Sequence, residues 1–249
     1  MAEYDNRIVR GTAAGYAETM DMGLRAHMLR VYNYMVGALA LTGVVAYVVA
    51  NSPALLNMLY QQGANGALAP TMLGWVVMLA PIGLVFFLSF RVMQMSQSAA
   101  QATFWVYAAL TGASLSSILI AYTGASVAMT FFVTAGTFGA MSLYGYTTKR
   151  DLSGLGSFLM MGLIGLLLAS LANMFFQSSA MNFVISVVGV LIFTGLTAWD
   201  TQKIKNTYYE VGGNAAVAGK AAIMGALSLY LDFLNIFLFM LRIFGGNRS

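Results

Sequence analysis

Two aspartates stand in stretches of the sequence that are otherwise apolar. Asp232 lies within Ala226-Leu-Ser-Leu-Tyr-Leu-Asp-Phe-Leu-Asn-Ile-Phe, and Asp200 ends the run Leu196-Thr-Ala-Trp-Asp. An ionisable group in hydrocarbon costs roughly 3 kcal/mol on insertion scales, and such groups usually face a protein interior and serve a function. We therefore take these two carboxyl groups as the candidate working groups of the protein.

The neighbours of each aspartate leave a simpler interpretation open. Ser228 and Asn235 stand four before and three after Asp232, so all three lie on one polar face of a helix. This face should point inward, and a protonated Asp232 that only joins helices would also explain it. Lys203 stands three residues after Asp200, so an ordinary ion pair at the membrane surface is the simpler reading of Asp200.

If the two carboxyl groups meet, they form a proton-operated latch. Two neighbouring carboxylates repel each other in a poor solvent, so the pair would share a proton and titrate as a unit. Arg91 closes an apolar run on the same side as Asp200. It is a candidate counter-ion, with a snorkelling arginine as the alternative. An opened pair of oxygen ligands, Asp200 and Asp232, would suit a hard cation such as Ca²⁺.

The depth of the two aspartates sets a geometric condition. Asp200 lies about one turn from Lys203, near the membrane surface. Asp232 follows Lys220 by roughly 18 Å of helix. Equal depth therefore requires either that the helix around Lys220 projects from the membrane or that the preceding span continues past Asp200.

The composition predicts a membrane protein made of helices. Apolar residues make up 59% of the 249 residues and charged residues 8%, against about 45–50% and about 25% in typical soluble domains. A span needs roughly 20 apolar residues, and the runs are too long and too uniformly apolar for barrel strands. We predict seven spans in one domain: Val31–Ala50, Met72–Phe90, Ala102–Tyr122, Val127–Tyr146, Leu155–Phe176, Met181–Trp199 and Ala221–Phe244.

Charge places the N-terminus in the cytoplasm. Residues 1–30 form a polar tail in which we expect His27 to be solvated, and residues 31–249 form the membrane domain. Lys and Arg occupy the tail and then every second connection, which is the positive-inside pattern. Arg242 breaks this pattern if the last span crosses fully, and a re-entrant segment would restore it. The length of Ala221–Leu241, roughly 31 Å as helix, favours a full crossing.

The sequence argues against several other classes of protein. It contains no cysteine and a single histidine, which leaves no thiolate chemistry and no histidine cluster for a metal or other cofactor. No nucleic-acid motif is present. Intramembrane aspartyl proteases carry Gly-x-Gly-Asp at their second aspartate, and here Leu229, Tyr230 and Leu231 precede Asp232. We therefore expect no enzyme.

Around Asp200 and Asp232 the chain resembles the Bax inhibitor-1 (transmembrane Bax inhibitor motif) family, specifically its bacterial inner-membrane branch. The resemblance is carried by the Ala226–Leu238 segment with Asp232, by Trp199-Asp200, and by Lys149-Arg150-Asp151-Leu-Ser. Some relatives carry an acidic residue in span two, where this chain has Ala80-Pro81. A third carboxylate for an ion site is therefore missing.

The resemblance implies both a fold and a function. It implies that helix seven is central and surrounded by helices 1–3 and 4–6, that Asp200 and Asp232 form a pH-sensing pair, and that Arg91 is its basic partner. It also implies a pH-sensitive calcium leak through the inner membrane. Bacterial relatives are linked to a membrane-bound ATP-dependent protease, so a non-conducting modulator of such a protease is the alternative function.

Overall fold

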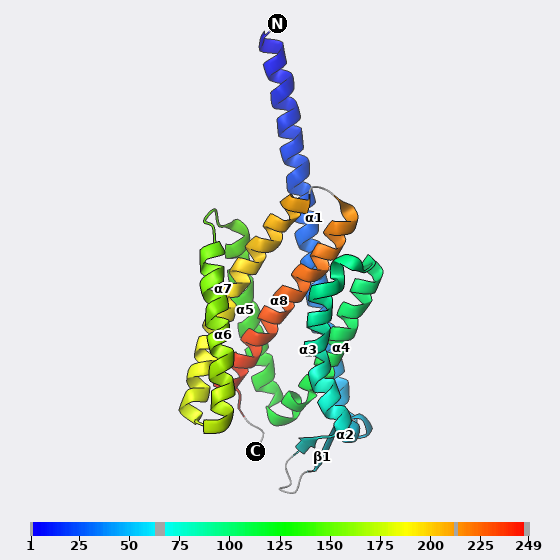
Figure 1. Cartoon of the computed structure of the whole chain (residues 1–249), viewed down its shortest axis with the longest axis vertical. Coiled ribbons are helices and arrows are strands. Elements are labelled where there is room, and N and C mark those ends of the chain that lie inside the picture. Colours follow the sequence, from blue (N-terminus) through cyan, green and yellow to red (C-terminus); the bar gives the residue numbers. More distant parts are fainter. Residues whose placement is uncertain (1, 63–67, 212–213, 247–249) are drawn as a thin grey trace.

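Seven long apolar helices form a bundle, as predicted. The computed structural model describes residues 2–62, 68–211 and 214–246, and seven of its helices are long and apolar enough to cross a membrane. Figure 1 shows them running roughly parallel to one long axis. They are α1 (Ala2–Asn51), α3 (Met72–Arg91), α4 (Gln97–Ala121), α5 (Gly124–Thr147), α6 (Ser153–Phe176), α7 (Ser179–Val211) and α8 (Ala215–Phe244).

Polar residues in the short connections fix where several helices begin. Thr71, Ser96 and Thr123 each accept a hydrogen bond from the backbone N–H three residues on, at 3.0, 3.2 and 3.3 Å. Asn214 accepts from both Ala216 and Val217. The first N–H groups of a helix have no partner within it, and hydrocarbon offers none, so these caps favour starts at the polar connections.

The last helix crosses the whole bundle. In Figure 1, α8 runs obliquely across the bundle, from the end at which α1 projects to the opposite end. This agrees with the full crossing favoured by the length of the last apolar run. Arg242 therefore lies at the end of the bundle opposite to the N-terminus.

Two helices are longer than their apolar runs. Helix α1 is continuous from Ala2, and Leu24 on it is already buried, before the predicted start at Val31. Helix α7 continues from the predicted end at Trp199 to Val211. The extension of α7 meets the geometric condition set by the two aspartates, because it lets Asp200 lie inside the bundle.

A small hairpin that was not predicted closes the end of the bundle opposite to the N-terminus. It consists of the short helix α2 (Pro53–Leu59) and the antiparallel strands β1 (Tyr60–Gln62) and β2 (Leu68–Pro70). The Thr71 hydroxyl donates to the backbone oxygen of Met58 at 2.6 Å and ties this hairpin to the start of α3.

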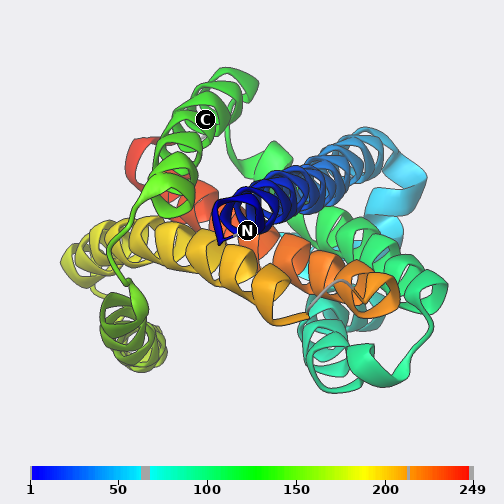
Figure 2. The same cartoon turned by 90° about the horizontal axis from the view of Figure 1, so that it is seen from above.

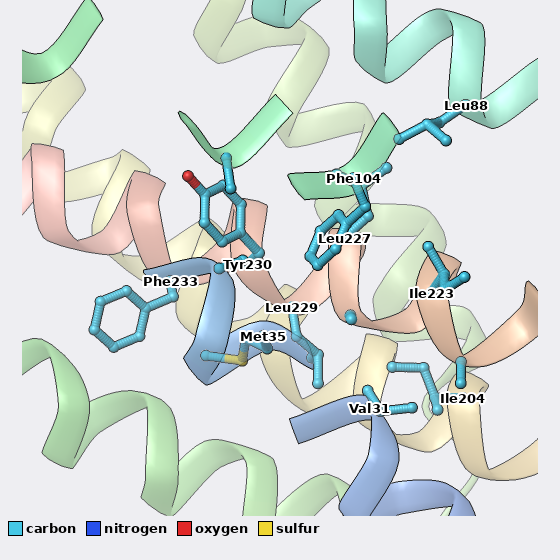
Figure 3. Close-up of a cluster of buried hydrophobic side chains, with 14 of the residues drawn as sticks. Val31, Met35, Leu88, Phe104, Ile204, Ile223, Leu227, Leu229, Tyr230 and Phe233 are labelled. Atoms are coloured by element: carbon cyan, nitrogen blue, oxygen red, sulfur yellow. The ribbon is translucent and has the colours of Figure 1, made fainter. Parts of the chain in front are cut away.

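Helix α8 is the most buried of the seven spans. It packs against α7, α1, α5 and α4, and it touches the short 3-10 helix η1 (Val92–Gln94) that follows α3. Figure 2 shows it passing beneath α1 when the bundle is seen from above. The largest side chains of the core cluster around it, among them Tyr230 and Leu229 of α8 and Phe104 of α4 (Figure 3).

Candidate functional site

The contact between α7 and α8 brings Asp200 and Asp232 together. Their carboxyl groups lie close enough to interact with each other. A carboxylate can only accept hydrogen bonds, so a hydrogen bond between the two groups would require one shared proton. The helices approach closely here because Gly225 has no side chain, and a Cβ at this position would lie 2.9 Å from the side chain of Ile204.

Asp232 is the more deeply placed of the two. Its residue is 4% exposed, and its Oδ2 has no hydrogen-bond partner among the described residues. An isolated charge in such a setting is strongly disfavoured, whereas a neutral acid is tolerated. The geometry therefore suits a pair that carries one shared proton in the closed bundle.

Asp200 also feels a positive charge from its own helix. Lys203 attracts the Asp200 carboxyl group electrostatically, but its Nζ lies over the Trp199 ring, 4.9 Å from the ring centroid. Lys203 is exposed, and within the described part of the chain it forms no direct ion pair with Asp200. The simple surface ion pair thus does not describe Asp200, whose carboxyl group lies close to that of Asp232.

A cavity of about 300 Å³ adjoins Asp200 on the side of the chain's N-terminal end, and we call it the Asp200 cavity. Helices α1, α3, α7 and α8 contribute its walls. Its polar lining comprises His27, Ser89, Asp200, Lys203, Thr207 and Ser228. Ser228 of the predicted polar face therefore lies beside the cavity. Asn235, the other member of that face, is not among the lining residues. Its amide donates back to the carbonyl of Leu231 at 2.8 Å.

The prediction of a solvated His27 is wrong. His27 is 5% exposed, its ring lies 5.3 Å from that of Tyr208, and its Nε2 has no hydrogen-bond partner in the part of α1 and its surroundings that the structure describes. The apolar spacing of Leu24, Met28 and Val31 was a signal that could have placed His27 on a buried face. The charged residues Arg25 and Arg30 near His27 made that spacing hard to recognise.

Arg91 is not brought to the aspartate pair. It is exposed at the end of α3, and its Nη1 donates to the Oε1 of Gln94 at 3.0 Å. Among the described residues it makes no ion pair with Asp200 or Asp232. In this arrangement of the helices, no contact among the described residues supports the predicted role of Arg91 as a counter-ion.

Asp200 and Asp232 are the two predicted calcium ligands at this site. Calcium takes six to eight oxygen ligands, and the described residues contain no group of three His, Cys, Asp or Glu side chains that could hold a metal. A role of the pair in binding calcium stays a prediction.

Polar contacts fix α7 at the level of the pair. The Gln202 side chain accepts from the N–H of Leu152 and donates to the carbonyl of Arg150, both at 2.8 Å, so it holds the connection between α5 and α6. The Nζ of Lys205 donates to the carbonyl of Tyr146 at 2.9 Å. These bonds stabilise the extension of α7 on which the position of Asp200 depends.

Comparison with known proteins connects this chain to a family. A family model described as "Inhibitor of apoptosis-promoting Bax1" matches residues 24–249. The inner membrane protein YbhL of Escherichia coli K12 is 47% identical over 227 residues, which covers 91% of this chain and 94% of YbhL. An uncharacterised Rickettsia prowazekii protein, RP147, is 48% identical over 96% of this chain and 97% of its own length.

Proposed function

Because the chain belongs to the Bax inhibitor-1 family, we propose that it is a calcium leak channel of the inner membrane whose gate is the proton shared by Asp200 and Asp232. The family assignment gives the class of protein. The observation that carries the proposal is the proximity of the two carboxyl groups where α7 meets α8. The pair lies beside the Asp200 cavity, where it would act as a barrier to ions.

The gate follows from the charge on the pair. With one proton, the carboxyl groups attract each other and join α7 to α8. Loss of that proton leaves two buried anions that repel, in surroundings that solvate them poorly. The helices then separate at this level, water from the Asp200 cavity reaches the carboxylates, and the negative site attracts cations. We thus expect a leak that increases as the pH rises.

Beyond the pair the bundle is closed by apolar packing. Phe233 follows Asp232 directly, Ile236 lies one turn further along α8, and both are buried; Met240 follows with 7% exposure. Opening at the aspartates must therefore extend to this layer before an ion can cross. In this proposal the structure is the closed state, and the pair is the first barrier from the cavity side.

Calcium flux into proteoliposomes over a series of pH values tests the gate. We expect flux through the unmodified protein to rise with pH, and expect Asp200→Asn and Asp232→Asn to lose most of that dependence because neither variant can form a pair of anions. Asp151→Asn is the matched control, since Asp151 lies in the exposed connection before α6. A pH profile that is the same in all four proteins would contradict the proposal.

The alternative, a non-conducting modulator of a membrane-bound ATP-dependent protease, draws on the N-terminal part of α1. Figure 1 shows this helix projecting beyond the bundle, where a partner could reach it. If the alternative holds, deletion of residues 2–21 should abolish control of the protease. Absence of flux at every pH, together with protease control that needs this segment, would favour the alternative.

A further inference from the structure

A long groove lies between α1 and α5 on the outer surface of the bundle. Three neighbouring cavities of about 460, 610 and 130 Å³ form it. The first two share Tyr32 and Phe138, and the second and third share Gly43 and Phe131. We call this continuous feature the α1/α5 groove.

The groove exists because α1 and α5 pack on other helices. Helix α1 packs mainly on α4 and α8, and α5 packs mainly on α7 and α8. In the view of Figure 2, α8 is visible between α1 and α5. Phe233 of α8 forms part of the groove wall, where its ring contacts those of Phe131 and Phe138 of α5 at centroid distances of 5.4 and 5.6 Å.

Two glycines keep the groove wide. A Cβ added at Gly43 or at Gly139 would meet no atom within 4 Å, so neither glycine serves a close approach of helices. Both line the groove, Gly139 near its N-terminal-side end and Gly43 further along. A larger side chain at either position would enter the groove without displacing the backbone.

The chemistry of the groove is apolar with one cation at its mouth. Arg25 is exposed and lines the first cavity, together with Met28, Leu29 and Leu143. The Tyr32 hydroxyl in its wall is already bonded to Ser142 at 2.6 Å. An occupant must therefore be a long apolar group with a negative charge at one end.

We propose that the α1/α5 groove holds an acyl chain of an anionic phospholipid whose phosphate contacts Arg25. One leaflet contributes about 15 Å of hydrocarbon, which corresponds to about ten residues of helix. That is the separation between Arg25 and Met35, which line the first and second cavities. The inference does not depend on conduction or on the aspartate pair.

Native mass spectrometry of the full chain released from nanodiscs tests the proposal. The nanodiscs contain phosphatidylcholine and phosphatidylglycerol with the same acyl chains, so retention reports the headgroup. We expect one phosphatidylglycerol to remain on the unmodified protein. Arg25→Gln should lower its retention relative to phosphatidylcholine about fivefold, because a basic residue near the surface contributes about 1 kcal/mol to anionic lipid binding. Arg150→Gln, an exposed arginine outside the groove, should leave retention unchanged.

Filling the groove gives the sharper test. Gly139→Leu and Gly43→Leu should each abolish retention of the lipid. Gly136→Leu is the matched control on α5, because Gly136 also has open space at its Cβ but lines none of the groove's cavities. Equal retention in Gly139→Leu and Gly136→Leu, or a dimer mass in place of a lipid adduct, would overturn the proposal.

A second measurement on the unmodified protein covers the case in which a leucine variant fails to fold. Spin-labelled phosphatidylglycerol should show a motionally restricted component that unlabelled phosphatidylglycerol displaces several-fold more effectively than phosphatidylcholine. Absence of a restricted component, or displacement by both lipids equally, would overturn the proposal.

Discussion

At the scale of single residues, the buried histidine has a measurable consequence. His27 leaves its Nε2 unpaired beside the Asp200 cavity, and an unsatisfied buried polar atom costs about 1–3 kcal/mol. We expect His27→Phe to raise the free energy of unfolding by about 1 kcal/mol, since the ring can still pack on Tyr208. Thermal unfolding in detergent measures this. A loss of stability would show that Nε2 has a partner in the membrane.

The exposed Asp151 gives a prediction about pH. The pKa of this carboxyl lies below its ordinary value of 3.8, chiefly because Ser153 donates hydrogen bonds to it, including one from the backbone N–H at 2.9 Å. A depressed pKa means that the bond stabilises the start of α6 above the ordinary pKa and is lost as the pH falls through the lowered one. The protection factor of the Ser153 amide, which corrects for the base-catalysed intrinsic exchange rate, should fall only in strong acid. A fall already near neutral pH would contradict this.

How far the sequence could predict the site also depends on single residues. Asp200 and Asp232 stood out because charges in apolar runs are rare. Ser228 followed from helical spacing, and the structure places it beside the Asp200 cavity. The position of Arg91 could not be predicted, because hydropathy locates the end of a helix but not the direction of a flexible side chain on its surface.

At the scale of elements, close contact of backbones holds the site together. A Cβ at Gly145 of α5 would lie 2.2 Å from the carbonyl oxygen of Ala198 on α7, two residues before Asp200. We expect Gly145→Ala to cost about 1–3 kcal/mol, because α5 must move away from α7. Gly139→Ala on the same helix should be nearly neutral, since its Cβ has open space. Unfolding temperatures of the two variants in one detergent check this, and equal values would contradict it.

Element boundaries were predictable only where lipid sets them. The apolar runs gave the seven spans, since the length of hydrocarbon to be crossed fixes their minimum extent. The extension of α7 to Val211 and the early packing of α1 lie in polar sequence, where hydropathy carries no signal. The strands Tyr60–Gln62 and Leu68–Pro70 are too short for a period-2 pattern to be recognised.

At the scale of the whole molecule, orientation remains a prediction that labelling can check. The chain contains no cysteine, so single cysteines give clean probes. Gln61 and Lys149 are both exposed and lie in connections separated by an odd number of spans. We expect an impermeant maleimide to label Gln61→Cys in intact spheroplasts and Lys149→Cys only after permeabilisation. The reverse pattern would place the N-terminus outside.

The central position of α8 could not be derived from composition alone. Its apolar run resembles the others, and hydropathy does not distinguish a helix that faces lipid from one that faces protein. The resemblance to the family implied a central helix seven. In the structure α8 is the most buried span and packs against α7, α1, α5 and α4, and Asp232 lies on it beside Asp200 of α7.

One contact near the middle of α8 determines how this helix can move. The Thr42 hydroxyl of α1 donates to the carbonyl of Ala108 of α4 at 2.9 Å and meets the Tyr230 hydroxyl at 2.6 Å. Tyr230, two residues before Asp232, is thus a point about which α8 can pivot. Lys220 lies about 15 Å along the helix from this point. A tilt of about ten degrees there displaces Lys220 by about 3 Å. This is enough to detach its Nζ from the carbonyl of Met93, which it reaches at 2.7 Å.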